Sequence, residues 1–130
     1  MSTRANVILK DEQDKLIFYR HSDGYPEGTL PTLNEFLDLL KKGTIRNNVS
    51  QSAGWLIVIG ANEYKTQYPP QDWKVGAYEP TTNIHGDIEY LYTIDLISKS
   101  IKVEKVHCDY STDKQTFTEI SAKNPQKIKL

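Results

Sequence analysis

The amino-acid sequence predicts an α+β fold, an antiparallel sheet of about four to six strands with two helices on one face. Two strand-like segments come first, two helical segments follow, and further strand-like segments complete the chain. Strands and helices grouped in this way favour an antiparallel sheet over alternating βαβ units. We expect one domain, 1–130, in which residues 121–130 form a basic tail.

The first two segments predict a β-hairpin. In residues 3–10, Ala5, Val7 and Leu9 alternate with residues that face the other way, as expected for a strand. Residues 15–21 are rich in β-forming side chains. The polar tetrad DEQD between the two segments is typical of a four-residue hairpin loop.

The clearest helix covers residues 32–42. Thr32 and Glu35 have the spacing of a capping box, and apolar residues recur behind them with the helical period. Gly43 is the residue type that is preferred just after a helix, where the backbone turns left-handed. The apolar stripe predicts that one face of this helix lies in the core.

A second helix is predicted at residues 49–65, although the run WLIVIG within it would also fit a buried strand. The length of the segment favours a helix, and Asn48 with Gln51 repeats the capping pattern. Gly54 and Gly60 lower the helix propensity, which indicates that the helix lies close against another element.

The second half of the chain predicts further strands. Prolines interrupt residues 67–73, and residues 74–79 are a candidate short strand. Residues 88–96 alternate strongly and form a second predicted hairpin with residues 101–106. The predicted core consists of the apolar residues on the inner faces of these elements: Val7, Leu9, Phe18, Leu33, Phe36, Leu37, Leu40, Ile57, Tyr90, Tyr92 and Ile94.

Composition and charge favour a cytoplasmic protein. The apolar share of 38% and the charged share of 25% are ordinary for a globular chain. The single cysteine, Cys108, forms no internal disulfide, and we find no apolar leader and no run long enough to cross a bilayer. Nine Lys/Arg face thirteen Asp/Glu in residues 1–98, against seven and four in 99–130. Without a long apolar run, we expect no membrane partner. A few lysines without interleaved aromatic residues are a weak nucleic-acid signal, so we do not expect a nucleic-acid partner either.

Two stretches carry His-x-Asp at the end of a predicted strand, RHSDGYPEG at 20–28 and IHGDIEY at 84–90. If the second stretch is extended, its period of two residues places His85, Asp87 and Glu89 on one face. We therefore expect residues 19–27 and 84–90 to meet at one surface cleft.

Turn chemistry alone also explains either stretch. Asp23 can close an Asx turn, and Glu27 can cap a backbone amide of the helix that follows. Two charged turns of matching form are less expected than one, which favours a shared site.

Three chemistries fit these residues. His21 and His85 could act as acid and base in phosphodiester or N-glycosidic cleavage, with Glu89 or Asp87 orienting one of them. Imidazoles and carboxylates also suit a divalent metal, but the spacing matches no metal motif, so we assign no metal ligand and no cofactor. A polar pocket could instead hold a phosphorylated ligand, for which the expected contacts are Arg4, Tyr19, Arg20, Asp23, Tyr25, Glu27, Asp87 and Tyr90.

Three segments carry a resemblance: STRANV at 2–7, YRHSDGYPEG at 19–28 and HGDIEYLYTID at 85–95. Together they resemble a family of small uncharacterised proteins encoded by bacteriophages and prophages. Many members carry an aromatic residue where this chain has Ser22, which argues against a stacking role at that position. The resemblance implies a viral or mobile-element origin and, by analogy with small proteins of this source, an action against host defence.

We therefore expect a non-catalytic viral accessory protein in the cytoplasm of a bacterial host. It would bind a host protein or a small phosphorylated ligand, such as a nucleotide, through the His/Asp/Glu/Tyr cluster. Two alternatives stay open. One is a small hydrolase that uses His21 and His85, and the other is a homodimeric structural protein whose exposed strand edges pair.

Overall fold

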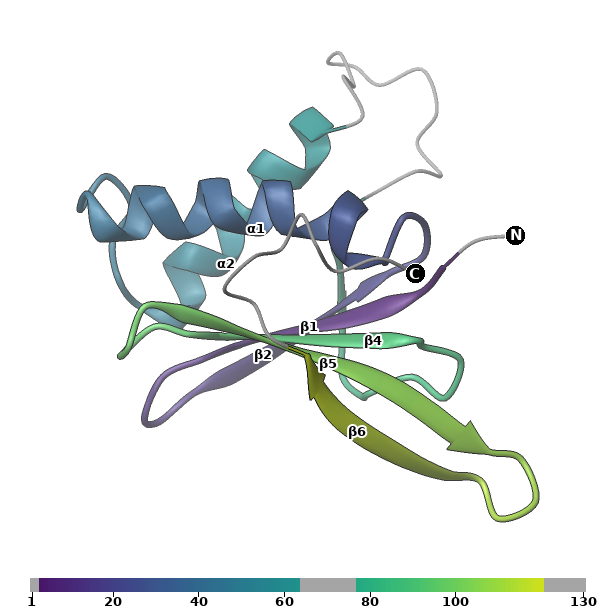
Figure 1. Cartoon of the computed structure of the whole chain (residues 1–130). Coiled ribbons are helices and arrows are strands. Elements are labelled where there is room, and N and C mark those ends of the chain that lie inside the picture. Colours follow the sequence, from purple (N-terminus) through teal and green to yellow (C-terminus); the bar gives the residue numbers. More distant parts are fainter. Residues whose placement is uncertain (1–2, 64–76, 121–130) are drawn as a thin grey trace.

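The computed structural model describes residues 3–63 and 77–120, in which two helices lie over one face of a six-stranded sheet (Figure 1). The predicted α+β class is confirmed. In chain order the elements are β1 (Ala5–Lys10), β2 (Lys15–Arg20), α1 (Pro26–Lys41), α2 (Val49–Glu63), β3 (Glu79–Thr81), β4 (Tyr90–Asp95), β5 (Ser100–Asp109) and β6 (Lys114–Ile120).

The strands lie in the order β3-β2-β1-β4-β5-β6, and the sheet is antiparallel except at one pair. The chain leaves β2, passes through both helices and β3, and returns as β4 on the far side of β1. Strand β4 then runs parallel to β1, with Ala5 opposite Tyr90. The predicted first hairpin is confirmed, because Lys10 pairs with Lys15 across a four-residue loop.

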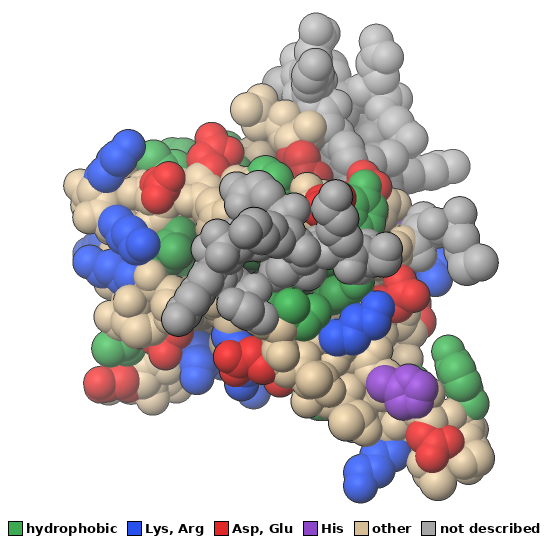
Figure 2. Space-filling view, in the orientation of Figure 1, with side chains coloured by type: hydrophobic (Ala, Val, Ile, Leu, Met, Phe, Trp, Pro, Cys, Tyr) green, Lys and Arg blue, Asp and Glu red, His purple; other side chains and the backbone are tan. Residues whose placement is uncertain are grey.

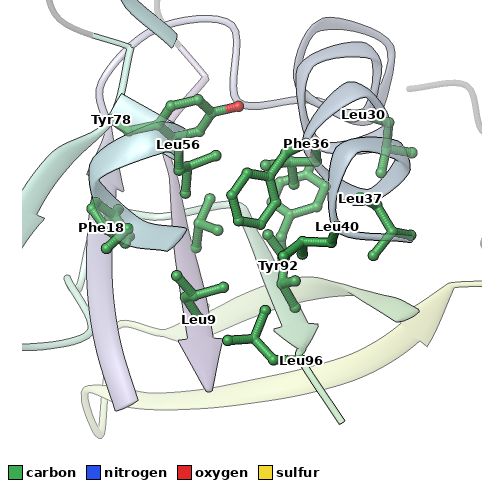
Figure 3. Close-up of a cluster of buried hydrophobic side chains, with 14 of the residues drawn as sticks. Leu9, Phe18, Leu30, Phe36, Leu37, Leu40, Leu56, Tyr78, Tyr92 and Leu96 are labelled. Carbon is green, nitrogen blue, oxygen red and sulfur yellow. The ribbon is translucent and has the colours of Figure 1, made fainter. Parts of the chain in front are cut away.

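The main core lies between the sheet and the helices (Figure 3). Alternate residues of β1, β2 and β4 point toward the helices, as the period of two requires. Every predicted core residue except Ile57 is buried here, together with residues that the sequence did not single out, such as Leu30, Leu56, Tyr78, Leu96 and Val103.

A smaller apolar cluster lies on the other face of the sheet. Its buried members are Tyr19, Ile88, Leu91 and Val106, and Ile8 and Ile84 pack against it. This face carries no helix among the described residues. The loop between β3 and β4 supplies Ile84 and Ile88, so it covers one end of the face and leaves the other end open.

Helix α1 begins six residues before the predicted capping box, so the interpretation of Thr32 as its N-cap is wrong. Tyr25 is the N-cap residue, and Pro26 stands at the first helical position, where its missing N–H costs nothing and its fixed φ matches the helix. Thr32 therefore lies inside the helix, buried. The end is as predicted, because Gly43 adopts a φ of 74° directly after the C-cap.

Helix α2 is capped as the sequence predicts, since Asn48 Oδ1 accepts the N–H of Gln51 at 2.8 Å. Its buried stripe consists of Val49, Ser52, Ala53, Leu56 and Gly60. The prediction that Ile57 lies in the core is wrong, because its side chain is 38% exposed. Gly60 packs against Tyr78, and this close approach sets the rotation of the helix.

The strands after α2 differ in extent from the predicted ones. Strand β3 lies at Glu79–Thr81 rather than 74–79, and the predicted break at 67–73 lies outside the described residues. Strand β5 runs on to Asp109 and turns into β6, which the sequence analysis missed. Strand β5 pairs with β4 only as far as residue 105. The rest of the β5–β6 hairpin projects from the body of the molecule (Figure 1).

No helix within residues 3–63 and 77–120 has the length and apolar character needed to cross a membrane. In space-filling view, charged side chains of both signs cover the end of the molecule where α1 ends (left of Figure 2).

Replacing Gly60 and Gly54 by alanine tests the rotation of α2. A Cβ on Gly60 would clash with Tyr78 Cδ2 and lie 3.0 Å from Ala77 Cβ, whereas one on Gly54 would meet nothing within 4 Å. We expect Gly60→Ala to lower the free energy of unfolding by about 1–3 kcal/mol through overpacking. Gly54→Ala should raise it by about 0.5–1 kcal/mol, the difference in helix propensity. Urea unfolding measures both, and equal effects would contradict this rotation.

Candidate functional site

Arg20 positions the loop that carries the site. Its side chain is fully buried on the helix face of the sheet and binds both carboxylate oxygens of Glu63 at the end of α2. Its Nε donates to the carbonyl of Asp23 at 3.2 Å, and its Nη2 donates to the carbonyl of Gly28 at 3.1 Å. Thr32 Oγ1 donates to the same Glu63 carboxylate. The strand end, the loop and both helices are thus tied to one guanidinium.

The loop itself has little conformational freedom. Asp23 adopts a left-handed φ of 57°, and its carbonyl also accepts a hydrogen bond from Thr29 Oγ1. Gly24 follows and approaches the first strand so closely that a Cβ would lie 2.8 Å from the carbonyl oxygen of Thr3. Only glycine fits this contact. The buried hydroxyl of Tyr92 donates to the Gly24 carbonyl at 2.7 Å and closes the arrangement.

A polar cluster lies on the opposite face of the sheet, and we call it the Tyr19 cluster: Arg4, Tyr19, His21, His85 and Asp87. The Tyr19 hydroxyl donates to Asp87 Oδ2 at 3.0 Å and lies 3.3 Å from His21 Nδ1. Arg4 Nε lies 3.3 Å from Asp87 Oδ2 and 3.4 Å from His21 Nδ1. Residues 19–27 and 84–90 thus meet in space through Tyr19, as expected.

His85 occupies a well-defined position in the cluster. Its imidazole stacks on the Tyr19 ring, with the ring centroids 4.0 Å apart and the planes at 16°. Its Nε2 lies 3.0 Å from Thr81 Oγ1. Its backbone is held by two amide side chains, because Asn6 Oδ1 accepts its N–H and Gln115 Nε2 donates to its carbonyl. Contacts from four strands, β1, β2, β3 and β6, therefore hold this one residue.

The hydrogen bonds assign protons within the cluster. Burial, with the Asp87 carboxylate second, raises the pKa of Tyr19 to about 12, so the phenol stays protonated and acts as a donor. Its single proton goes to Asp87, because a carboxylate only accepts. Arg4 Nε donates to His21 Nδ1, which places the proton of the neutral imidazole on Nε2.

Several residues expected at the site lie elsewhere. Arg20 and Tyr90 are buried on the helix face, and Tyr25 packs against the main core as the N-cap of α1. Asp23 takes part in the loop through its backbone carbonyl, and Glu27 is exposed in the first turn of α1. Tyr90, Tyr25, Asp23 and Glu27 form no side-chain hydrogen bond or ion pair with the Tyr19 cluster within the described residues.

The expectation that residues 85–89 are extended is wrong. The chain turns at Gly86 and Asp87, and Ile88 joins the apolar cluster of Leu91 rather than the core face of Tyr90. His85 and Asp87 still belong to one cluster, because Tyr19 contacts both. Glu89 lies beyond the turn, where its backbone N–H donates to the carbonyl of Arg4 at 2.8 Å and its side chain is exposed.

Sequence reasoning missed the residues that position the site. Asn6 is fully buried in a central strand, and its Nδ2 also donates to the Phe18 carbonyl at 2.9 Å. A polar amide inside an alternating apolar strand is a detectable signal, because such a group must be satisfied when buried. Thr81, Gln115 and Glu63 carry no such signal, since polar residues of these types are common at exposed positions.

The described part of the chain contains no group of three or more His, Cys, Asp and Glu residues arranged to hold a metal ion. Comparison of the chain with protein-family models, curated proteins and solved structures finds no match. The likeness to phage and prophage proteins therefore stays a prediction.

Breaking the Arg20–Glu63 pair should destabilise the protein strongly. Arg20→Met leaves a partly buried carboxylate without its partner, and we expect a loss of about 3–5 kcal/mol in the free energy of unfolding. The double variant with Glu63→Met should lose less than the sum of the two single variants. The control Arg4→Met removes a half-exposed ion pair and should cost less than about 1 kcal/mol. Similar losses at Arg20 and Arg4 in urea unfolding would contradict the assignment.

The raised pKa of Tyr19 predicts a pH dependence of stability. The folded state holds this proton up to about pH 12, whereas an unfolded tyrosine loses it near its ordinary pKa of about 10. The resulting stability is present below pH 10 and is lost as the pH rises toward 12. In urea unfolding between pH 9 and 11, Tyr19→Phe should weaken the alkaline loss of stability, and the exposed Tyr110→Phe should not. Identical profiles for the two variants would contradict the prediction.

Proposed function

We propose that this protein binds a small phosphorylated ligand, such as a nucleotide, at the Tyr19 cluster and does not convert it. The observation that carries the proposal is a set of hydrogen-bond donors at the exposed edge of the cluster. His21 has its Nε2–H, and Arg4 has two terminal nitrogens that donate no hydrogen bond within the described residues. Guanidinium and imidazole donors side by side favour phosphate oxygens.

The remaining members of the cluster act as supports. Asp87 accepts from Tyr19 and pairs with Arg4, so it holds the guanidinium in place and balances its charge while the site is empty. Tyr19 is 8% exposed, and its ring is packed between the smaller apolar cluster and His85. Such preorganisation lowers the entropic cost of binding.

The geometry favours binding over hydrolysis. An acid–base pair requires both imidazoles to reach one substrate within hydrogen-bond distance. His85 instead stacks on Tyr19 and directs Nε2 at Thr81, and the third residue of the proposed catalytic set, Glu89, lies beyond the turn. Tyr19 remains protonated, so it does not serve as a base near neutral pH.

The proposal agrees with the resemblance to phage and prophage proteins. A viral accessory protein in the cytoplasm of a bacterial host could act against defence by sequestering a phosphorylated signal, with no chemistry of its own. A host protein as partner, and a homodimer through paired strand edges, are the alternatives that the experiment below separates from this proposal.

Incubation with a panel of linear and cyclic nucleotides tests it, with retention and turnover followed by mass spectrometry and affinity by calorimetry. We expect retention of an unchanged nucleotide. Arg4→Gln and His21→Gln should each weaken binding about tenfold, the effect of one charge-assisted hydrogen bond of about 1.4 kcal/mol. The control Arg46→Gln removes an exposed arginine outside the cluster and should have no effect.

Two outcomes would overturn the proposal. Multiple turnovers that are lost in His21→Ala would make the protein a hydrolase. Absence of any retained nucleotide would exclude the small-ligand role, and size-exclusion chromatography coupled to light scattering would then distinguish a homodimer from a monomer that binds a host protein.

A further inference from the structure

The open end of the sheet face without helices is hollowed by a groove. The groove has a volume of about 450 Å³, with Ile8, Leu91 and Thr93 as its floor and Lys10, Lys15 and Lys102 among its walls. This volume falls within the range of about 300–1,000 Å³ that encloses small ligands. The lysine end of the groove lies away from the Tyr19 cluster, because the six residue steps of extended chain from Arg4 to Lys10 span about 20 Å.

Two lysines of this groove, Lys10 and Lys15, lie where their charges repel each other. Lys10 and Lys15 are direct cross-strand partners, so their side chains stand next to each other on one face. Like charges at directly opposite positions destabilise a sheet. Neither lysine forms an ion pair within residues 3–63 and 77–120, where the recorded pairs involve Arg4, Arg20 and Lys102.

The acidic residues nearby are used by other groups. Asp95 lies opposite Lys10, but its Oδ1 accepts the backbone N–H groups of Ile97 and Ser98 in the following turn. Glu104 pairs with Lys102 at 3.8 Å. Asp11 holds the hairpin loop by accepting backbone N–H groups from that loop. An anion between Lys10 and Lys15 would therefore meet two ammonium groups that have no carboxylate within 4 Å among residues 3–63 and 77–120.

We infer that this groove binds a small amphipathic anion, with its oxyanion between Lys10 and Lys15 and its flat apolar body on Ile8 and Leu91. The positive charges of Lys10 and Lys15 favour a negatively charged head group, and the apolar side chains of Ile8 and Leu91 favour an apolar body. Leu91 is 7% exposed and belongs to the smaller apolar cluster, against which Ile8 packs, so the floor is held in place before a ligand arrives. A phosphate, sulfonate or carboxylate head satisfies the same two lysines.

The test uses 8-anilinonaphthalene-1-sulfonate as a probe, together with N-phenyl-1-naphthylamine, which lacks the sulfonate. We expect the anionic probe to bind with increased fluorescence and the double variant Lys10→Gln/Lys15→Gln to raise its Kd about tenfold, equivalent to 1.4 kcal/mol. The control Lys41→Gln/Lys42→Gln makes the same change in net charge at the end of α1 and should leave the Kd unchanged. Added salt should weaken binding of the anionic probe alone.

Amide chemical-shift mapping and a floor variant complete the test. The probe should shift amides of β1, β2 and β4 around Ile8, and Ile8→Thr, which keeps a β-branched side chain, should weaken binding of both probes. Shifts centred on the exposed Trp55 and Val58 of α2 would overturn the inference, since these residues offer a competing apolar surface. Equal effects of the two lysine pairs, or no binding of the anionic probe, would also overturn it. Arg4→Gln should not change the probe's affinity, so this result is independent of the nucleotide experiment.

Discussion

The buried ion pair between Arg20 and Glu63 is the constraint on which the rest of the structure depends. Arg20 ends β2 with its side chain on the helix face, where it binds α2 through Glu63 and the loop through two carbonyls. Because side chains alternate along a strand, burying Arg20 on this face directs Tyr19 to the opposite one. The position of the Tyr19 cluster thus follows from where one guanidinium finds its partners.

The Arg20–Glu63 pair contributes more to selecting one strand register than to the net free energy of folding. Taking a guanidinium and a carboxylate out of water costs several kcal/mol per ion, which their attraction recovers only with good geometry and further hydrogen bonds. Here two carbonyls and Thr32 supply those bonds. A one-residue slip of β2 would place Arg20 on the face without helices, far from Glu63, so the pair penalises the wrong register. It also joins β2 to the ends of both helices, which are distant in sequence.

Features of this fold that depend on neighbouring residues could be predicted from the sequence, whereas contacts between distant residues could not. The first hairpin, the Asn48 cap and Gly43 were predictable, because each depends on neighbours within a few residues. Thr32 was misread because its tertiary partner, Glu63, lies 31 residues away, and Ile57 because Gly60 meets a side chain from beyond α2. The meeting of residues 19–27 with 84–90 followed from the strand ends, whereas the turn at Gly86 did not. Arg20 looked like a ligand contact because no pattern marks which arginine will be buried.

Asn6 links the buried sheet to the Tyr19 cluster at the surface. Its amide is fully buried in a central strand, where it donates to the Phe18 carbonyl and accepts the N–H of His85. The loop after β3 is thereby fixed, and the His85 ring is laid on Tyr19. That coverage helps to bury the phenol, and burial is the main cause of its raised pKa. A protonated Tyr19 must donate to Asp87, and Asp87 in turn holds Arg4 beside His21. The outermost donors are therefore oriented by a chain of contacts that begins inside the sheet.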